Sequence, residues 1–221
     1  RYKSPTPIIL YAACVNALGK IADSISAIEV TYEGTTTFNA KRINNIFKDK
    51  KCNYTVMHDG GLGYSQNDSS VPAAWKIDLS KEDWFAFEDN FGTSEEKAFV
   101  AYFKSFVPEL KRKYDKVFLL RNERQVAIYS FDSGERFEPD YVLFLHSNKE
   151  SGYEQLQVFI EPKGSHLLEK DSWKEKFLLD IENKAVATKV FVDDNKYRIW
   201  GFHFYNEASR MNEFSEDMAR L

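Results

Sequence analysis

Two acidic residues and a lysine stand at the ends of neighbouring apolar segments, where they could act together on a phosphate ester. Asp140 introduces the apolar segment in FEPDYVLFL, and Glu161 closes the next one in LQVFIEPKG, two residues before Lys163. If these segments are antiparallel strands of a hairpin, the start of one lies beside the end of the other, so the two carboxylates converge. Side chains alternate across a strand, so Glu161 and Lys163 point the same way.

This residue set suits a divalent cation. Two carboxylates held about 4 Å apart repel each other by about 4 kcal/mol at an effective dielectric near 20. A bound cation removes that repulsion, and an all-oxygen site with few protein ligands suits Mg²⁺. Lys163 would add a fixed positive charge that orients or activates a water against a phosphate. The three residues are therefore a candidate site for metal-assisted phosphodiester hydrolysis.

The short pattern alone is weakly specific. An acidic residue two positions before a lysine occurs six times in the chain, mostly on expected helices, where residues two apart face different ways. Only Glu161 and Lys163 follow a buried strand with a Pro-Asp pair just before the preceding strand. The competing interpretation is a salt-bridged strand edge with no catalytic role.

The surrounding elements predict an α/β or α+β fold, with a central mixed sheet flanked by helices. Thr93-Ser94-Glu95-Glu96 is a capping-box arrangement that opens a helix ending near residue 113. After it we expect strands at 116–120, 125–131, 141–145, 156–160, 189–192 and 197–205, and helices at 172–182 and 212–221. Before it we expect helices at 8–25 and 40–51 and a strand at 28–32. The polar, glycine-containing stretch 58–70 is the best candidate for a domain boundary.

Composition limits the class of protein. The chain has 221 residues, of which 43% are hydrophobic and 29% charged, as in a globular protein. The net charge of −4 argues against a free-standing, strongly basic nucleic-acid binder. Two cysteines, Cys14 and Cys52, cannot form a secreted disulfide framework, so we expect a reducing, cytoplasmic setting. The first residue is Arg1 rather than Met, which we interpret as a sign of a longer polypeptide.

Other site types find little support in the sequence. No run of apolar residues approaches the roughly 18 of a membrane span, because Asn16 interrupts the segment from Pro7 to Leu18. No GxxxxGK[ST] phosphate loop is present, and the glycine cluster at 60–63 lacks the lysine that would reach a phosphate. The four histidines are spread without the spacing of a zinc site.

Several separate blocks resemble one known family. GTSEEKAFV, KYDKVFLLRNE, FEPDYVLFL and QVFIEPKGSHLLEKDSWKEKFL, in this order, resemble the C-terminal endonuclease domain of the restriction (Res) subunit of type III restriction-modification enzymes. That domain belongs to the PD-(D/E)xK nuclease superfamily. The resemblance covers roughly residues 77–204 and implies the restriction-endonuclease-like fold. It divides the chain into residues 71–221, the endonuclease domain, and residues 1–70, a helical and strand segment that is a linker or subdomain of a larger chain.

The resemblance assigns roles to particular residues. Asp140 and Glu161 match the family's metal-binding carboxylates, and Lys163 matches its catalytic lysine. The superfamily often places a further glutamate on the helix before the core strands, and Glu96 is the natural candidate, although its place in the capping box explains it equally well. His166 could approach the phosphate, and Lys174 could contact the DNA backbone; a loop histidine and a solvated charge are the competing interpretations.

The resemblance also implies cofactors and partners. The cofactor would be Mg²⁺, with Mn²⁺ able to substitute, and ATP would act only through a helicase-like motor domain outside these residues. The partners would be double-stranded DNA, a methyltransferase and specificity (Mod) subunit, and that motor domain, in a prokaryotic cytoplasm. Two alternatives stay open. One is a nuclease of the same superfamily in another restriction or repair system, and the other is a non-catalytic docking module with this fold.

Overall fold

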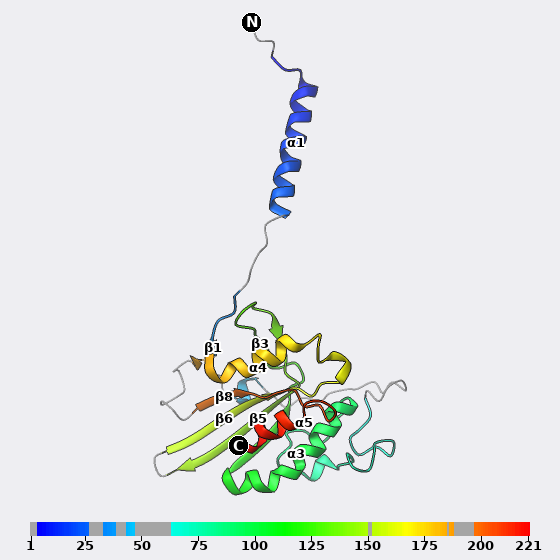
Figure 1. Cartoon of the computed structure of the whole chain (residues 1–221), viewed down its shortest axis with the longest axis vertical. Helices are drawn as coiled ribbons and strands as arrows, with labels where there is room; N and C mark the ends of the chain where they lie inside the picture. The colour runs from blue at the N-terminus through cyan, green and yellow to red at the C-terminus, as the bar shows by residue number, and fades with distance from the viewer. Residues whose placement is uncertain are drawn as a thin grey trace.

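A four-stranded mixed sheet forms the centre of the computed structural model, which describes residues 4–26, 33–38, 43–46, 63–149, 152–184, 186–187 and 197–221. The strand order is β2-β5-β6-β8, with β5 antiparallel to both of its neighbours and β8 parallel to β6. The parallel pair requires a crossover, which α4 provides (Figure 1). The elements are β2 (Lys116–Arg121), β5 (Tyr141–Lys149), β6 (Gly152–Ile160), α4 (Ser172–Lys184) and β8 (Tyr197–Gly201).

Helices cover both faces of the sheet because the strands alternate two apolar side-chain sets. On one face Tyr141 and Leu143 of β5 pack with Phe99 of α3 (Ser94–Lys113) and Phe214 of α5 (Met211–Ala219). On the other face Val142 belongs to a separate core with α4, which contributes Phe177, Leu178 and Ile181. The expected α/β architecture, a mixed sheet flanked by helices, is confirmed at this level.

The expected strand at 125–131 is wrong as a member of the central sheet. Only Ile128–Tyr129 (β3) is extended there, and it pairs with Arg136–Phe137 (β4) in a separate two-stranded hairpin. The chain leaves β2 through Glu123 and Arg124, whose φ angles of 36° and 59° turn the backbone away from the strand direction. The sequence pattern gave no sign of this turn, because it contains no glycine or proline.

Other boundaries differ in smaller ways. The strand expected at 197–205 ends at Gly201, and the following residues return only at an isolated bridge between Pro162 and Tyr205. The strands expected at 28–32 and 189–192 lie outside the described residues. Of the helix expected at 40–51, the described part is α2 (Ile43–Ile46). Two short 3₁₀ segments, η1 (Leu79–Lys81) and η2 (Ser165–Leu167), complete the described helical turns.

Part of the chain before residue 70 contacts the body of the protein. Strand β1 (Thr37–Phe38) pairs in parallel with β7 (Val186–Ala187). The ring of Phe38 lies 6.3 Å from the rings of both Phe131 and Phe159. Closer to the expected boundary, the fully buried Gln66 donates hydrogen bonds to the carbonyl oxygens of Trp75 and Lys97.

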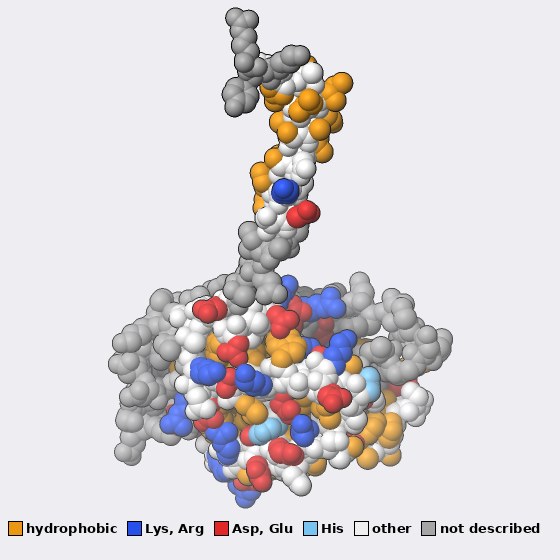
Figure 2. Space-filling view, turned by 45° about the horizontal axis from the view of Figure 1, so that its top comes forward, with side chains coloured by type: hydrophobic (Ala, Val, Ile, Leu, Met, Phe, Trp, Pro, Cys, Tyr) orange, Lys and Arg blue, Asp and Glu red, His pale blue; other side chains and the backbone are white. Residues whose placement is uncertain are grey.

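Helix α1 (Pro7–Ser26) is apolar yet exposed. It extends away from the sheet in Figure 1, and hydrophobic side chains cover much of its surface in Figure 2. Its residues 7–25 have a mean hydropathy of 1.5, and none of that stretch is buried. By length and composition alone this helix could cross a membrane, although it contains no unbroken run of about 18 apolar residues. Asn16, Lys20 and Asp23 break the apolar run without lowering its mean enough.

Candidate active site

The β5–β6 hairpin brings Asp140 and Glu161 together as the sequence predicts. Tyr141 at the start of β5 pairs with Ile160 at the end of β6, so the residues just outside this pair face each other. The main-chain amide of Asp140 donates a hydrogen bond of 3.0 Å to Oε2 of Glu161. Asn122 directly follows β2, and its main-chain amide donates a hydrogen bond of 2.8 Å to the carbonyl oxygen of Asp140. This bond helps to hold the backbone of Asp140 in place.

Lys163 joins this pair from the segment that follows β6. Its Nζ lies 2.7 Å from Oε1 of Glu161 and 2.9 Å from Oδ2 of Asp171. The lysine side chain is only 10% exposed, and its ammonium group lies 5.7 Å from the centre of the Phe204 ring. The expected convergence of two acidic residues and one lysine is therefore present, and a third acidic residue, Asp171, holds the lysine from the other side.

The bridge to Tyr205 fixes the backbone of this segment. The amide of Tyr205 donates to the carbonyl oxygen of Glu161 at 3.1 Å, and the amide of Lys163 donates to the carbonyl oxygen of Tyr205 at 2.9 Å. These two bonds hold residues 161–163 extended beyond the end of β6. An extended backbone keeps Glu161 and Lys163 on one face.

The carboxyl groups of Asp140 and Glu161 both have a raised pKa. Burial, together with the negative charges of Glu161 and Glu96, raises the pKa of Asp140 well above its ordinary range, although Lys163 and Arg121 partly oppose this. Burial also raises the pKa of Glu161, against the opposing effect of Lys163. Burial thus favours the protonated form of both carboxyl groups, and a bound cation would favour the ionised form.

The lysine remains positively charged. Burial acts to lower the pKa of Lys163, but its ion pairs with Glu161 and Asp171 outweigh burial, and the pKa is raised. For Asp171, burial is outweighed by hydrogen bonds from Lys174 and Lys163, which lower its pKa. At neutral pH Lys163 is thus a fixed cation between two carboxylates.

Glu96 belongs both to the start of α3 and to the surroundings of the site. Its main-chain amide donates to Oγ1 of the N-cap residue Thr93 at 3.3 Å, and its Oε1 accepts from the same hydroxyl at 3.3 Å. Its other oxygen accepts from Arg121 of β2, with Nε at 3.0 Å. The charge of Glu96 acts on Asp140, so the helix start and the site are electrostatically connected. Glu96 thus takes part in the cap of α3, and its charge also acts on Asp140.

His166 and Lys174 both belong to the chain that follows Lys163. His166, in η2, lies beside Gly164, where an added Cβ atom would be 2.9 Å from the imidazole Cε1 and 3.0 Å from Oε1 of Glu95. Gly164 thus allows this close approach. Lys174, in the first turn of α4, donates to the same Asp171 oxygen that accepts from Lys163. Lys174 is thus linked to Lys163 through Asp171.

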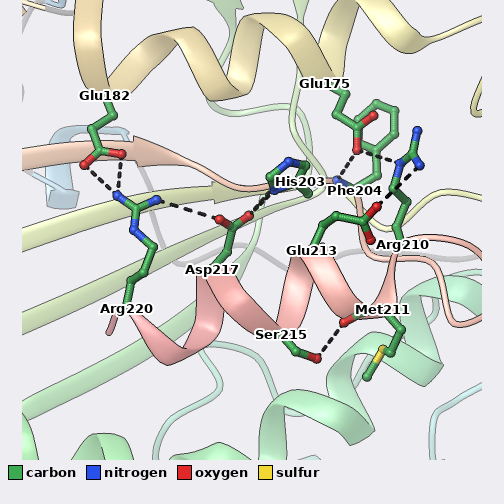
Figure 3. Close-up of polar contacts among 10 residues, drawn as sticks. All are labelled: Glu175, Glu182, His203, Phe204, Arg210, Met211, Glu213, Ser215, Asp217 and Arg220. Atoms are coloured by element: carbon green, nitrogen blue, oxygen red, sulfur yellow. Dashed lines mark hydrogen bonds and ion pairs between the residues drawn. The ribbon is translucent and has the colours of Figure 1, made fainter.

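Polar contacts from α4 and α5 hold the segment that follows β8 (Figure 3). Glu175 of α4 accepts from the amide of Phe204 at 3.0 Å and from Nε of Arg210 at 3.3 Å. Asp217 of α5 accepts from the amide and from Nδ1 of His203, at 2.7 and 2.8 Å. These contacts fix residues 203–205, whose backbone in turn holds Glu161 and Lys163.

The donor set fits magnesium with few protein ligands. No group of three or more His, Cys, Asp or Glu side chains within the described ranges is arranged to hold a metal. Mg²⁺ is commonly bound through one or two carboxylates, with waters and substrate phosphates completing its coordination. Asp140 and Glu161 would supply these carboxylates, and burial is the main cause of their raised pKa values.

Two residues of this region escaped the sequence-based prediction. Asp171 directly precedes α4 and looks like an ordinary helix-start residue, so only the fold shows that it contacts Lys163. Arg121 ends β2 and looks like a strand-edge charge, yet it pairs with Glu96 and Glu123. The register of β2 against β5 places Arg121 opposite Tyr141, next to Asp140, and an earlier prediction of that register would have identified it.

Comparison with known proteins identifies a family. The family model HI_1054_C, described as a C-terminal domain, matches residues 31–220. A protein of Haemophilus influenzae (strain ATCC 51907 / DSM 11121 / KW20 / Rd) that carries the name "Uncharacterized protein" is 29% identical over 215 residues. That alignment covers 94% of this chain, and the chain spans 44% of the length of this relative. No solved structure matches the chain.

Proposed function

The chain belongs to the HI_1054_C family of C-terminal domains, and we propose that it is a magnesium-dependent endonuclease domain acting on double-stranded DNA. The observation that carries this proposal is the convergence of Asp140, Glu161 and Lys163 at one end of the β5–β6 hairpin. Two carboxylates and a protonated lysine, held by backbone contacts on a rigid sheet, are suited to bind a metal and a phosphate side by side.

The order of the elements supports the same proposal. A helix that carries Glu96 precedes a mixed sheet, and the motif residues lie where β5 begins and where β6 ends. This is the placement expected from the resemblance to the endonuclease domain of type III restriction enzymes. In this proposal the fold is of the PD-(D/E)xK type. The methylating subunit and the ATP-driven motor domain would be separate partners of the complete enzyme.

Asp140 and Glu161 are the residues that would hold Mg²⁺, or Mn²⁺ in its place. A bound cation would supply Lewis acidity and charge compensation at the phosphate. The main-chain amide of Asp140 donates to Glu161, which orients the Glu161 carboxylate beside Asp140. Their elevated proton affinity means that they bind a cation best in the ionised state, at neutral to alkaline pH.

Lys163 would orient the attacking water and stabilise the negative charge that develops on the phosphate. Its raised pKa keeps it protonated, so it serves as a hydrogen-bond donor and cation rather than as a proton acceptor. Attack in line would leave a 5′-phosphate and a 3′-hydroxyl. One such site cuts one strand, so a double-strand break would need a second copy or a second event.

Plasmid cleavage with matched variants tests this proposal. Supercoiled DNA is incubated with the purified chain, with Mg²⁺ or with a chelator, and nicked and linear products are quantified. Glu161→Gln should abolish Mg²⁺-dependent nicking. Glu154→Gln, which changes a partly exposed glutamate on the same strand, should leave it unchanged. Equal nicking by wild type and a folded Glu161→Gln variant would leave a docking module as the better interpretation.

A further inference from the structure

A surface hollow lies beside the candidate active site. It is lined by Arg136, Phe137, Glu138 and Lys174. The first three of these residues directly precede Pro139-Asp140, and the fourth lies in the first turn of α4, three residues after Asp171. A ligand in this hollow would therefore lie next to the residues proposed for hydrolysis.

One carboxylate oxygen connects the hollow to the site. Oδ2 of Asp171 lies 2.9 Å from Nζ of Lys163 and 2.9 Å from Nζ of Lys174. Lys163 has a second anionic partner, Glu161, whereas within the described part of the chain Asp171 is the one ion-pair partner of Lys174. The charge of Lys174 is therefore only partly compensated, and a further anion can approach it favourably.

Aromatic rings hold Lys174 at the wall of the hollow. Its Nζ lies 5.6 Å from the centre of the Phe137 ring and 5.8 Å from that of Trp173. Ring faces attract cations, so these contacts and Asp171 fix the position of the ammonium group. The side chain nonetheless keeps 22% of its surface exposed, which leaves it accessible from the hollow.

Arg136 adds a second, more mobile cation. Its side chain is 60% exposed and pairs with the neighbouring carboxylate of Glu138. An exposed ion pair of this kind contributes little to stability, so a phosphate can replace Glu138 as the partner of Arg136 at small cost. The planar guanidinium also matches two phosphate oxygens at once.

We infer that this hollow is a second phosphate-binding subsite, which holds a backbone phosphate of the DNA strand next to the one that is cut. Lys174 and Arg136 bind the phosphate, and Asp171 connects Lys174 to Lys163. The identification of the ligand as DNA rests on the proposed function. The hollow extends that proposal because it places a contact with the substrate outside the Asp140, Glu161 and Lys163 set.

The salt dependence of DNA binding tests this inference. A fluorescently labelled duplex is titrated with the purified chain in a chelator, so that no cleavage occurs, at several salt concentrations. The logarithm of the binding constant falls linearly with the logarithm of the salt concentration. Each lost phosphate contact reduces the magnitude of this negative slope by about 1. Lys174→Met should lower the slope by about one contact, and its combination with Arg136→Met by about two, on any duplex sequence.

Two further variants separate charge from packing. Lys176→Met removes a lysine of the same helix that is 70% exposed and pairs with Asp132, outside the hollow, and it should leave the slope unchanged. Lys174→Arg keeps the charge and should retain the wild-type slope. Equal slopes for wild type and Lys174→Met, or no binding by the wild-type chain, would overturn the subsite.

Cleavage assays on the same proteins keep the two proposals distinguishable. Nicking that depends on Glu161 but binding that is indifferent to Lys174 would refute the subsite and leave the nuclease proposal intact. Binding that depends on Lys174, together with no metal-dependent nicking, would refute the nuclease proposal and retain the hollow as a DNA contact. Circular dichroism of each variant establishes that it is folded.

Discussion

The main-chain amide of Asp140 donates a hydrogen bond of 3.0 Å to Oε2 of Glu161, although the two residues are 21 positions apart in the chain. The backbone of one acidic residue thus orients the side chain of the other. Because this bond uses the amide and not the Asp140 carboxylate, that carboxylate stays available to a ligand. Replacing the Asp140 side chain should therefore leave the position of Glu161 largely intact, which makes Asp140 a suitable residue for testing the site.

Asp140→Asn should stabilise the protein near neutral pH. The pKa of Asp140 is raised, so the folded state binds its proton more tightly than the unfolded chain does. The Asp140 carboxyl therefore stabilises the folded state fully at a pH below the ordinary aspartate pKa. This stabilisation is lost as the pH rises through the pKa that Asp140 has in the folded protein. Asparagine removes the uncompensated charge, and a gain on the order of 1 kcal/mol would raise Tm by about 2–4 °C.

The control for this prediction is Asp132→Asn. The pKa of Asp132 is lowered by its exposed pair with Lys176, so this substitution should not raise Tm. Thermal unfolding of both variants at neutral and at acidic pH is the measurement. A gain for Asp140→Asn that persists unchanged at acidic pH would show that the charge of Asp140 is not its cause.

Magnesium should raise the Tm of the wild-type chain in the absence of DNA. A ligand that binds the folded state alone stabilises it by mass action. The gain should disappear in Asp140→Asn and in Glu161→Gln, because each removes one of the two proposed ligands. Differential scanning fluorimetry over a range of Mg²⁺ and Mn²⁺ concentrations measures it. A shift of equal size in Glu161→Gln would place the cation elsewhere.

Asp171→Asn should slow cleavage. Asp171 is a positioning residue that holds Lys163 through an ion pair of 2.9 Å. A loss of about tenfold in kcat corresponds to about 1.4 kcal/mol in the activation barrier. Because Asp171 also helps to raise the pKa of Lys163, the alkaline limb of the pH–rate profile should move to lower pH. Asp171→Glu should restore part of the rate, and an unmoved profile would argue against this role.

The two roles of Glu96 can be separated by variants of the cap. Thr93→Ala removes the hydroxyl that caps α3 and should lower stability by about 1 kcal/mol, with cleavage largely retained. Glu96→Gln keeps the size of the side chain but removes the charge that acts on Asp140, and it should lower the cleavage rate more than Thr93→Ala does. Unchanged cleavage by Glu96→Gln would reduce this residue to a helix cap.

The packing of α4 on β8 should depend on Gly201. A Cβ atom added there would lie 2.3 Å from the carbonyl oxygen of Leu178 and 2.6 Å from its carbon, both main-chain atoms that cannot move independently. Gly201→Ala should therefore destabilise the fold by about 1–3 kcal/mol or more. At Gly19 of α1 an added Cβ meets nothing within 4 Å, so Gly19→Ala is the matched control. Chemical denaturation compares the two.

Features that depend on short stretches of sequence, such as the start of α3 and the strands that carry the motif, were predicted correctly from the sequence. The capping motif at Thr93 placed the start of α3, and apolar runs placed the parts of β5 and β6 next to the motif, at 141–145 and 156–160. Their antiparallel pairing, which the prediction assumed, is present. That pairing alone is enough to bring Asp140 to Glu161. The motif spacing then placed Lys163 on the same face, and the ion pair of 2.7 Å agrees with it.

What the sequence could not supply depends on contacts between distant segments. Asp171 meets Lys163 because the chain between them turns through η2. Tyr205 fixes the motif backbone because its segment runs beside Pro162. The departure of the chain from β2 at Glu123 and Arg124 depends on a left-handed turn without glycine. Such features are selected by the packing of the whole domain and leave no distinct local pattern.

The central claim is that Asp140, with Glu161, supports metal-dependent hydrolysis of DNA, and analysis of the cut ends tests it most directly. Plasmid DNA is treated with wild type, Asp140→Asn and Asp132→Asn in Mg²⁺, and the ends are examined by direct ligation and by labelling before and after phosphatase treatment. We expect 5′-phosphate and 3′-hydroxyl ends from wild type and Asp132→Asn, and no cleavage by the folded Asp140→Asn variant. Undiminished cleavage by Asp140→Asn, or no metal-dependent cleavage by any of the three proteins, would contradict the claim.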